Sequence, residues 1–453
     1  MPMPEPARLS REIARWAAAL RYEDLPEATV AAVKIRLLDM MAVAWAGSDA
    51  DGIPPVHAML AGQGGRGDAT VLAYGTKLPA GAAAMINGAM AGALDFDGLH
   101  EASGVHSDIA VVPAALAVAE RTSADGRALI AAIAAGEEIL IRLGLSSGLG
   151  PGWFFSSVLG VFGAAIAAGK LLDLDADAMN AALGVAFCHA TGSQQNLVEN
   201  ALTKRFQCGF TAQAGVLAAD MASVGAGGPL EAIEGKFGLA TLFTPIDQDV
   251  VLADLGRVFH MDELTLKKYP CCFCCHAGIE GALDLAERHD LKIDDILTIT
   301  AVVPPFSERL VGSAFVAAEA SQVAAQFSLP YALACALHRR RFSLADIELD
   351  QIRDPQVEAL AGRVSVLADD GGNARFQPVR LVIETQAGAK LETVVTELPG
   401  TPAQPLSEDE LRDKVRDGYG RGVMPINDAG ADAVWDRVMA LETSADAGAI
   451  LRP

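Results

Sequence analysis

The sequence predicts a mainly α protein in which a large helical domain, built from both chain ends, carries a smaller α+β domain. Apolar residues recur with a helical period from residue 8 to about 262 and again after about 405, whereas strand-like alternation is confined to the region between. A chain of 453 residues also exceeds one ordinary domain. We therefore expect residues 1–262 and 406–453 to form the helical domain and 263–405 the second domain.

Ala-rich amphipathic segments predict the first helices, at 27–45, 80–94, 126–143 and 210–223. The many Ala and Gly residues allow close approach between helices and favour a tightly packed bundle. The uncharged stretch 152–169 is long enough to span a membrane. Because Gly, Ser and Ala dominate it and Pro151 precedes it, a buried helix is the preferred interpretation.

Alternation of apolar residues predicts strands at 297–303, 363–367, 379–385 and 390–396, the last two joined as a hairpin through 386–388. Helices are expected between them at 276–287 and 317–338. After the strands, Ser407 and Glu410 have capping-box spacing before a charged helix, and another helix is expected at 428–441.

The net charge of −22, from 35 Lys and Arg against 57 Asp and Glu, argues against nucleic acid and anionic membranes as partners. An anionic ligand would need a local concentration of positive charge. Residues 1–16 contain no apolar signal segment, so a cytoplasmic location is expected. Four of the seven Cys lie at 271–275, and only His276 is near them as a further metal ligand. Packed, reduced thiols are favoured over a metal site.

Four segments carry residues suited to chemistry. The first, 95–108, holds several acids with His100 and His106; these residues either cap helices and face solvent or provide an acid or base with an orienting Asp. The second, 202–209, places Lys204 and Arg205 at a helix start, which attracts carboxylates unless it is only a solvated basic turn.

The third segment, 266–276, contains Lys267 and Lys268 before a Tyr-Pro pair and ends in His276. Paired lysines are commonly a solvated surface, and this remains the interpretation of Lys268. The fourth segment, 327–331, ends in Tyr331, which by itself would be interpreted as packing.

These segments resemble, in order and spacing, the MmgE/PrpD family, which includes 2-methylcitrate dehydratase, cis-aconitate decarboxylase and iminodisuccinate epimerase. ALDFDGLHEASGVHSDIAVVPAALA, beginning at residue 93, is similar to a family motif, with departures at Gly98, Leu99 and Ser107. The resemblance covers roughly residues 8–440. It implies an inserted lid domain, a homodimer and an active-site cleft between the domains.

The resemblance implies an active site without metal or nucleotide cofactor. Lys204 and Lys267 would hold substrate carboxylates and stabilise an enolate-like species. His106, oriented by Asp95, is expected to act as general base or acid. Tyr331 would donate to the substrate or leaving group. Further substrate contacts are expected from His100, Arg205 and His276.

The favoured activity is that of a hydro-lyase acting on a small hydroxy-polycarboxylate such as a 2-methylcitrate-like acid. An epimerase or isomerase of a dicarboxylate is the next alternative. A cis-aconitate-type decarboxylase is third, because Phe154 stands about where that branch of the family has a second His. A carboxylate-binding protein without catalysis is the alternative from another class.

Overall fold

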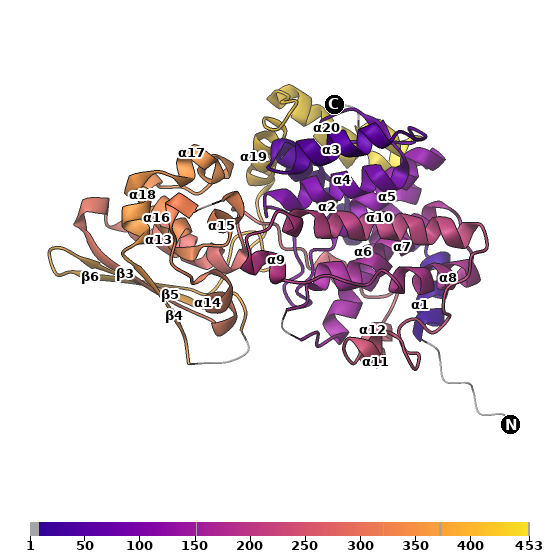
Figure 1. Ribbon diagram of the computed structural model, residues 1–453, viewed down its shortest axis with the longest axis horizontal. Coiled ribbons are helices and arrows are strands. Elements are labelled where there is room, and N and C mark those ends of the chain that lie inside the picture. The colour runs from indigo at the N-terminus through magenta and orange to yellow at the C-terminus, as the bar shows by residue number, and fades with distance from the viewer. Residues whose placement is uncertain (1–8, 151, 320, 371–373, 452–453) are drawn as a thin grey trace.

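The computed structural model describes residues 9–150, 152–319, 321–370 and 374–451. It is mostly helical with one small mixed sheet, as predicted. In Figure 1, most of the helices that precede the sheet lie on one side of the view, and the sheet lies on the other with further helices beside it. The helices that precede the sheet region are α1 Leu9–Ala19, α2 Glu27–Ala46, α3 Ile53–Gln63, α4 Ala80–Ala93, α5 Asp108–Thr122, α6 Gly126–Ser146, α7 Phe155–Leu171, α8 Ala176–Phe187, α9 Gln195–Val198, α10 Thr203–Ser223, α11 Leu239–Leu242 and α12 Gln248–Leu252.

A short antiparallel pair, β1 Ala69–Thr70 and β2 Lys77–Leu78, interrupts the expected all-helical region. The amide of Asn87 in α4 explains it, because its oxygen accepts from the Leu72 N–H at 3.0 Å and its nitrogen donates to the Thr70 carbonyl at 3.0 Å. These bonds satisfy backbone groups that a helix would otherwise pair. The pair does not join the main sheet.

The main sheet has the order β4-β3-β5-β6, with β3 parallel to β4 and antiparallel to β5. The predicted hairpin joins β5 to β6. Helices α13 and α16 pack against this sheet. The elements of this region are α13 His276–Arg288, β3 Ile296–Val303, α14 Pro305–Val311, α15 Gln322–Gln326, α16 Leu329–Arg339, α17 Leu349–Ile352, α18 Pro355–Ala361, β4 Val364–Ala368, β5 Val379–Thr385 and β6 Lys390–Val395.

The single helix predicted at 317–338 is wrong, because α15 and α16 are separate helices. The Ser328 hydroxyl accepts from the Tyr331 N–H at 3.2 Å and so caps a new helix, α16. Pro330 follows in the first turn of α16, where a missing N–H costs no helical hydrogen bond. Residue 320 of the predicted helix and Pro151 lie outside the described residues.

The C-terminal helices α19 Glu408–Tyr419 and α20 Asp428–Met439 pack against α2. Figure 1 shows them in yellow beside the indigo N-terminal helices. The Ser407–Glu410 capping box is confirmed. The domain boundaries at 262 and 405, and the role of the strand-containing part as a lid, stay predictions.

Close helix packing sets the position of the candidate site. A Cβ on Gly209 of α10 would lie 2.2 Å from the Met85 carbonyl oxygen of α4, so only glycine permits this crossing. Gly136 of α6 and Gly163 of α7 form a similar contact. Because α4 and α10 pack closely against each other, the chain that leaves α4 lies beside the first turn of α10. The predicted buried helix over 152–169 is confirmed as α7.

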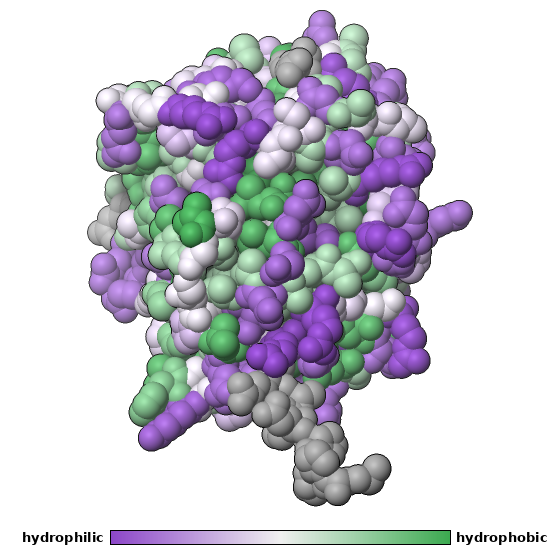
Figure 2. Space-filling model, turned by 90° about the vertical axis from the view of Figure 1, so that its right-hand side faces the viewer, coloured by the Kyte–Doolittle hydropathy of each residue, from purple (hydrophilic) through white to green (hydrophobic). Residues whose placement is uncertain are grey.

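None of the described helices is both long and apolar enough to cross a membrane. Figure 2 shows the face at the end of the molecule remote from the sheet, where hydrophilic and hydrophobic side chains are interspersed.

Candidate active site

A cavity of about 400 Å³ lies where residues that precede position 262 meet residues from the strand-containing part. Its polar lining includes five side chains that we call the cavity cluster: Asp95, Asp97, His106, Lys204 and Lys267. Much of the remaining lining is aromatic. Apolar walls of this kind strengthen electrostatic interactions within a cavity.

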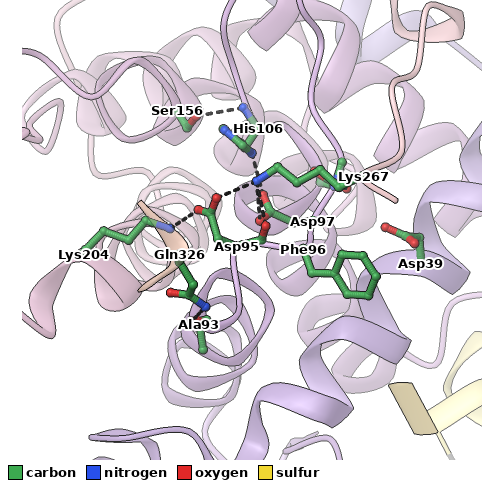
Figure 3. A network of polar contacts seen from close by, with 12 residues as sticks. Asp39, Ala93, Asp95, Phe96, Asp97, His106, Ser156, Lys204, Lys267 and Gln326 are labelled. Carbon is green, nitrogen blue, oxygen red and sulfur yellow. Dashed lines mark hydrogen bonds and ion pairs between the residues drawn. The ribbon is translucent and has the colours of Figure 1, made fainter. Parts of the chain in front are cut away.

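Asp95 stands at the centre of the cavity cluster. It follows the end of α4 in the left-handed conformation, with φ of 52°, which Asp adopts more readily than most residues. Lys204, in the first turn of α10, donates to one carboxylate oxygen. Lys267 donates to the other oxygen at 2.9 Å and to the Asp95 backbone carbonyl at 2.9 Å. Figure 3 shows the two lysines reaching Asp95 from different sides.

A short backbone pairing brings Lys267 to this point. The Leu99 N–H donates to the Thr265 carbonyl at 2.9 Å, and the Thr265 N–H donates to the Leu99 carbonyl at 3.1 Å. Residues 166 positions apart in sequence thereby run side by side, and Lys267 enters a buried position beside Asp95. The expected convergence of His106, Lys204 and Lys267 on one cavity is thus seen in the structure.

The charges of the cluster stabilise one another. Burial raises the pKa of the Asp95 carboxyl, but the charges of Lys204, Lys267 and His106 outweigh it and hold the pKa well below its usual value. The same opposition lowers the pKa of Asp97, mainly through His106 and Lys267. Burial lowers the pKa of Lys267, but Asp95 and Asp97 reverse the shift and raise it. Both carboxylates and the Lys267 ammonium therefore stay charged at neutral pH.

The expectation that Asp95 orients His106 is wrong, because Asp97 makes that contact. His106 Nδ1 lies 2.6 Å from the Asp97 carboxylate, whereas Asp95 is taken up by the two lysines. The His106 side chain is 20% exposed and lines the cavity, and no described residue hydrogen-bonds its Nε2. The backbone N–H of His106 donates to the Ser156 hydroxyl at 2.8 Å, and this bond holds the His106 backbone against α7. His106 can thus exchange a proton through Nε2.

The departures from the family motif have local explanations. A Cβ on Gly98 would lie 2.9 Å from the Asp108 carboxylate, so no larger residue fits there without a shift. Leu99 lines the cavity. The Ser107 hydroxyl accepts from Arg36 at 3.0 Å and ties the segment to the buried core. Phe154 packs against the His106 ring, with centroids 6.4 Å apart.

Four predicted site residues do not line this cavity. His100 Nδ1 lies 2.9 Å from the Ser103 hydroxyl, and burial lowers the pKa of His100 to about 4. Arg205 points elsewhere, donating to the Asp51 carbonyl at 2.7 Å and the Gln322 side chain at 2.5 Å.

The other two residues are equally enclosed. His276 is packed between aromatic rings, and burial, followed by the charge of Lys267, lowers its pKa to about 3. The Tyr331 hydroxyl, proposed to donate to the substrate, instead donates to the Asp346 backbone carbonyl. Direct substrate contact by these four side chains would need a rearrangement of the structure.

Sequence reasoning missed Asp97, Arg309 and Arg375 as cavity residues. Asp97 was one of several acids in its segment, and the left-handed turn at Asp95 decides which acid faces His106. Arg309 and Arg375 lie in the strand-containing part, outside every segment with a chemical pattern. No local signal in the sequence marks them.

The cysteine run offers no evident metal site. Among the residues that the structure describes, no group of three or more His, Cys, Asp or Glu side chains is arranged to hold an ion. All four cysteines of the run are buried and free of disulfides, as expected, and two of them, Cys272 and Cys274, reach the cavity.

The arrangement places a histidine paired with a carboxylate on the same cavity as two lysines, a combination suited to acid–base chemistry. Residues 11–249 match the MmgE/PrpD N-terminal domain, and residues 269–440 match the MmgE/PrpD C-terminal domain. The chain therefore belongs to the MmgE/PrpD family, and it is an enzyme of the lyase class.

Three relatives show how far the similarity extends. A cis-aconitate decarboxylase of Aspergillus terreus is 29% identical over 440 residues, covering 90% of this chain and 88% of the relative. The cis-aconitate decarboxylase-like protein oryM of Aspergillus oryzae is 25% identical and covers 98% and 96%, respectively. The cis-aconitate decarboxylase of Homo sapiens is 25% identical and covers 75% and 73%.

Proposed function

We propose that this lyase removes water from a small hydroxy-polycarboxylate, such as a 2-methylcitrate-like acid, by proton transfer next to a carboxylate. The observation that carries the proposal is the His106–Asp97 pair, which faces the same cavity as Lys204 and Lys267. A hydro-lyase needs a base for the carbon-bound proton and an acid for the departing hydroxide. This cavity holds a candidate for each.

His106 is the proposed base. Its Nδ1 is held by the Asp97 carboxylate at 2.6 Å, which stabilises the imidazolium formed when Nε2 accepts the proton. The Lys267 ammonium lies beside Asp95 and Asp97 and would stabilise the negative charge that develops on the substrate carboxylate. A donor in this role typically contributes a few kcal/mol.

Lys204 is the proposed acid. Its side chain is 11% exposed, and its ammonium pairs with Asp95 and lies 5.1 Å from the Phe327 ring centroid. Protonation of the leaving hydroxyl by this ammonium, with proton abstraction by His106, releases one water and leaves a carbon–carbon double bond. Transfer of the proton from His106 back to Lys204 through solvent would then restore the enzyme.

Product analysis by proton NMR in deuterated water tests this activity. Citrate, 2-methylcitrate and related hydroxy acids are incubated with the enzyme and with His106→Ala. We expect an alkene product and water loss with at least one of these acids, and a loss of that product in the variant. If no hydroxy acid yields an alkene, dehydration is rejected.

Decarboxylation of cis-aconitate is the second candidate, because the relatives carrying that name cover most of this chain. Phe154 beside His106 argues against it, since His106 is then the one histidine among the described residues that line this cavity. Carbon dioxide release from cis-aconitate in the same assay would favour this candidate over dehydration. Deuterium incorporation without any new product would instead favour an epimerase or isomerase.

We also propose that turnover requires no metal. The expected repulsion of a cation by two ammonium groups is smaller than the sequence implied, because Asp95 and Asp97 offset both lysines. Lys204 and Lys267 nevertheless already occupy the carboxylate oxygens of Asp95 that an ion would use. Activity should survive dialysis against EDTA. A loss that a divalent ion restores would reject this proposal.

The homodimer implied by the family resemblance is a further proposal. Exposed apolar side chains follow one face of α10, at Phe210, Leu217 and Met221, and continue to Val224 just after the helix. We expect a dimer in sedimentation analysis and a shift towards monomer in Leu217→Glu, with Val394→Glu on exposed β6 as the control. A monomeric wild-type protein would contradict it.

A further inference from the structure

The charges that line the cavity are unevenly distributed. On the helical side, Lys204 and Lys267 both bond to Asp95, and Lys267 also lies 3.9 Å from Asp97. Two ammonium groups thus face two carboxylates, and their charges cancel. The positive charge that remains belongs to Arg309 and Arg375, on the strand-containing side. Neither arginine forms an ion pair with any of the described residues.

Arg375 is held in place without a carboxylate partner. Its guanidinium carbon lies 5.9 Å from the Phe155 ring centroid and 5.8 Å from that of Phe306. Aromatic faces attract a guanidinium while leaving its N–H groups free to bond in the plane. Gly104 makes room for one of these nitrogens, because a Cβ there would lie 2.3 Å from Arg375 Nη1. The guanidinium therefore reaches the segment that leads to His106.

Arg309 shares one of these rings. Its guanidinium carbon lies 5.6 Å from the Phe306 centroid, so both arginines flank the same aromatic side chain. Two like charges around one ring repel each other, and a bound carboxylate would relieve that repulsion. In a protein with a net charge of −22, such a pair is also the local positive charge that an anionic substrate requires.

We infer that Arg375, assisted by Arg309, binds the carboxylate of the proposed polycarboxylate substrate that is remote from the reacting carbon. The inference rests on the proposed function, in which His106 and Lys267 act at the other carboxylate. The surplus of two positive charges on the cavity wall matches a substrate with two or more carboxylates. A monocarboxylate would leave the arginines without a partner.

Calorimetric titration with tricarballylate tests this assignment. Tricarballylate has three carboxylates but no hydroxyl, so it cannot lose water. We expect Arg375→Met to weaken its binding by roughly ten-fold or more and Arg309→Met by roughly three-fold, because a guanidinium–carboxylate pair is a strong, charge-assisted contact. Arg375→Lys should recover part of the loss, since it keeps the charge but not the planar fork.

The control is Arg380→Met, which removes an exposed arginine of β5 that pairs with Glu392 at 2.6 Å. Its affinity for tricarballylate should stay within about two-fold of wild type. Butyrate, with one carboxylate, should bind weakly and almost equally to wild type and Arg375→Met. Circular dichroism and melting curves of each variant exclude loss of folding as the cause.

The inference is overturned if folded Arg375→Met binds tricarballylate like wild type, or if wild type does not bind it. Kinetics separate this failure from that of the proposed function. If hydroxy acids are dehydrated but Arg375→Met keeps the wild-type KM, the arginine assignment fails alone. If tricarballylate binding depends on Arg375 while no hydroxy acid is dehydrated, the dehydratase proposal fails alone.

Discussion

Two groups of buried charges lie in the helical part of the protein and differ in what surrounds them. In the cavity cluster, His106 and Lys204 keep polar atoms at the edge of an open cavity. In the second group, on α6, Arg142 donates to Glu138 at 2.6 Å and to the carbonyls of Val251, Ala253 and Val258. Both Glu138 and Arg142 are fully buried, and neither lines the cavity.

The comparison separates buried charge that supports the fold from buried charge that can meet a substrate. The protein itself supplies hydrogen-bond partners for the polar side-chain atoms of Glu138 and Arg142, so none of these atoms is available to a ligand. In the cavity cluster, Asp97 pairs with His106 and Asp95 pairs with Lys204, and His106 and Lys204 also have polar atoms that face the cavity. Burial alone therefore does not mark a catalytic site; burial next to an accessible unsatisfied atom does.

The largest expected effect is on turnover in the cavity cluster. His106→Ala should reduce kcat by about 10²- to 10⁴-fold, with less change in KM, because it removes the base but no charge that holds the substrate. Asp97→Asn should reduce kcat in the same direction, since it leaves Nδ1 without its carboxylate. Steady-state kinetics on the identified substrate measure both. Full activity in His106→Ala would reject the site.

The α6 group should show the opposite behaviour. Arg142→Met leaves Glu138 buried without its partner and should lower the free energy of unfolding by about 3–5 kcal/mol. Turnover per folded molecule should stay near that of wild type. Arg127→Met, which removes an exposed arginine of the same helix, is the control and should change stability little. Equal stability of Arg142→Met and Arg127→Met would erase the distinction between the two groups.

Removal of Lys204 should have an intermediate effect. Lys204→Ala takes away a charge that both the bound substrate and the transition state use, so KM should rise and kcat should fall. We expect kcat/KM to drop by about 10²-fold, within the range of a lost electrostatic donor. Lys268→Ala is the matched control, because Lys268 pairs with Glu280 at 3.1 Å and does not line the cavity. A loss in kcat/KM of the same size in both variants would assign Lys204 only a general electrostatic role.

The sequence was sufficient to predict most of the helices and strands, because these depend on local patterns, whereas Lys204 and Lys267 were assigned through the resemblance to the family. Helix period, the Ser407–Glu410 capping box and the α10 N-terminus at Lys204 are all short-range features. The partner of His106 was assigned incorrectly because the left-handed turn at Asp95 separates two acids that look alike in sequence.

Arg375 and Tyr331 are two further side chains whose contacts could not be predicted from the sequence. Arg375 reaches the cavity only through packing between distant segments, against Phe155 and beside Gly104. Tyr331 matched a family motif, yet its hydroxyl donates to the Asp346 carbonyl, a partner that no sequence pattern predicts. Long-range contacts of this kind decide which polar atoms remain available.

The smallest expected effect concerns a third kind of buried group, a neutral histidine beside the cavity cluster. Burial, followed by the charge of Lys267, lowers the pKa of His276 from 6.5 to about 3. The unfolded chain binds a proton at this histidine below pH 6.5, whereas the folded protein does not until about pH 3. Stability is therefore lost as pH falls below 6.5, by up to about 1.4 kcal/mol per pH unit.

His276→Phe keeps an aromatic ring between Tyr269 and Phe273 but cannot take up the proton. From pH 7 to pH 5, wild type should lose about 2 kcal/mol more than this variant. Urea unfolding at both pH values measures the difference, and His289→Gln, at an exposed position, should behave as wild type. If wild type and His276→Phe lose the same stability, His276 is not held neutral by its surroundings, and the contrast between closed and open buried groups does not extend to it.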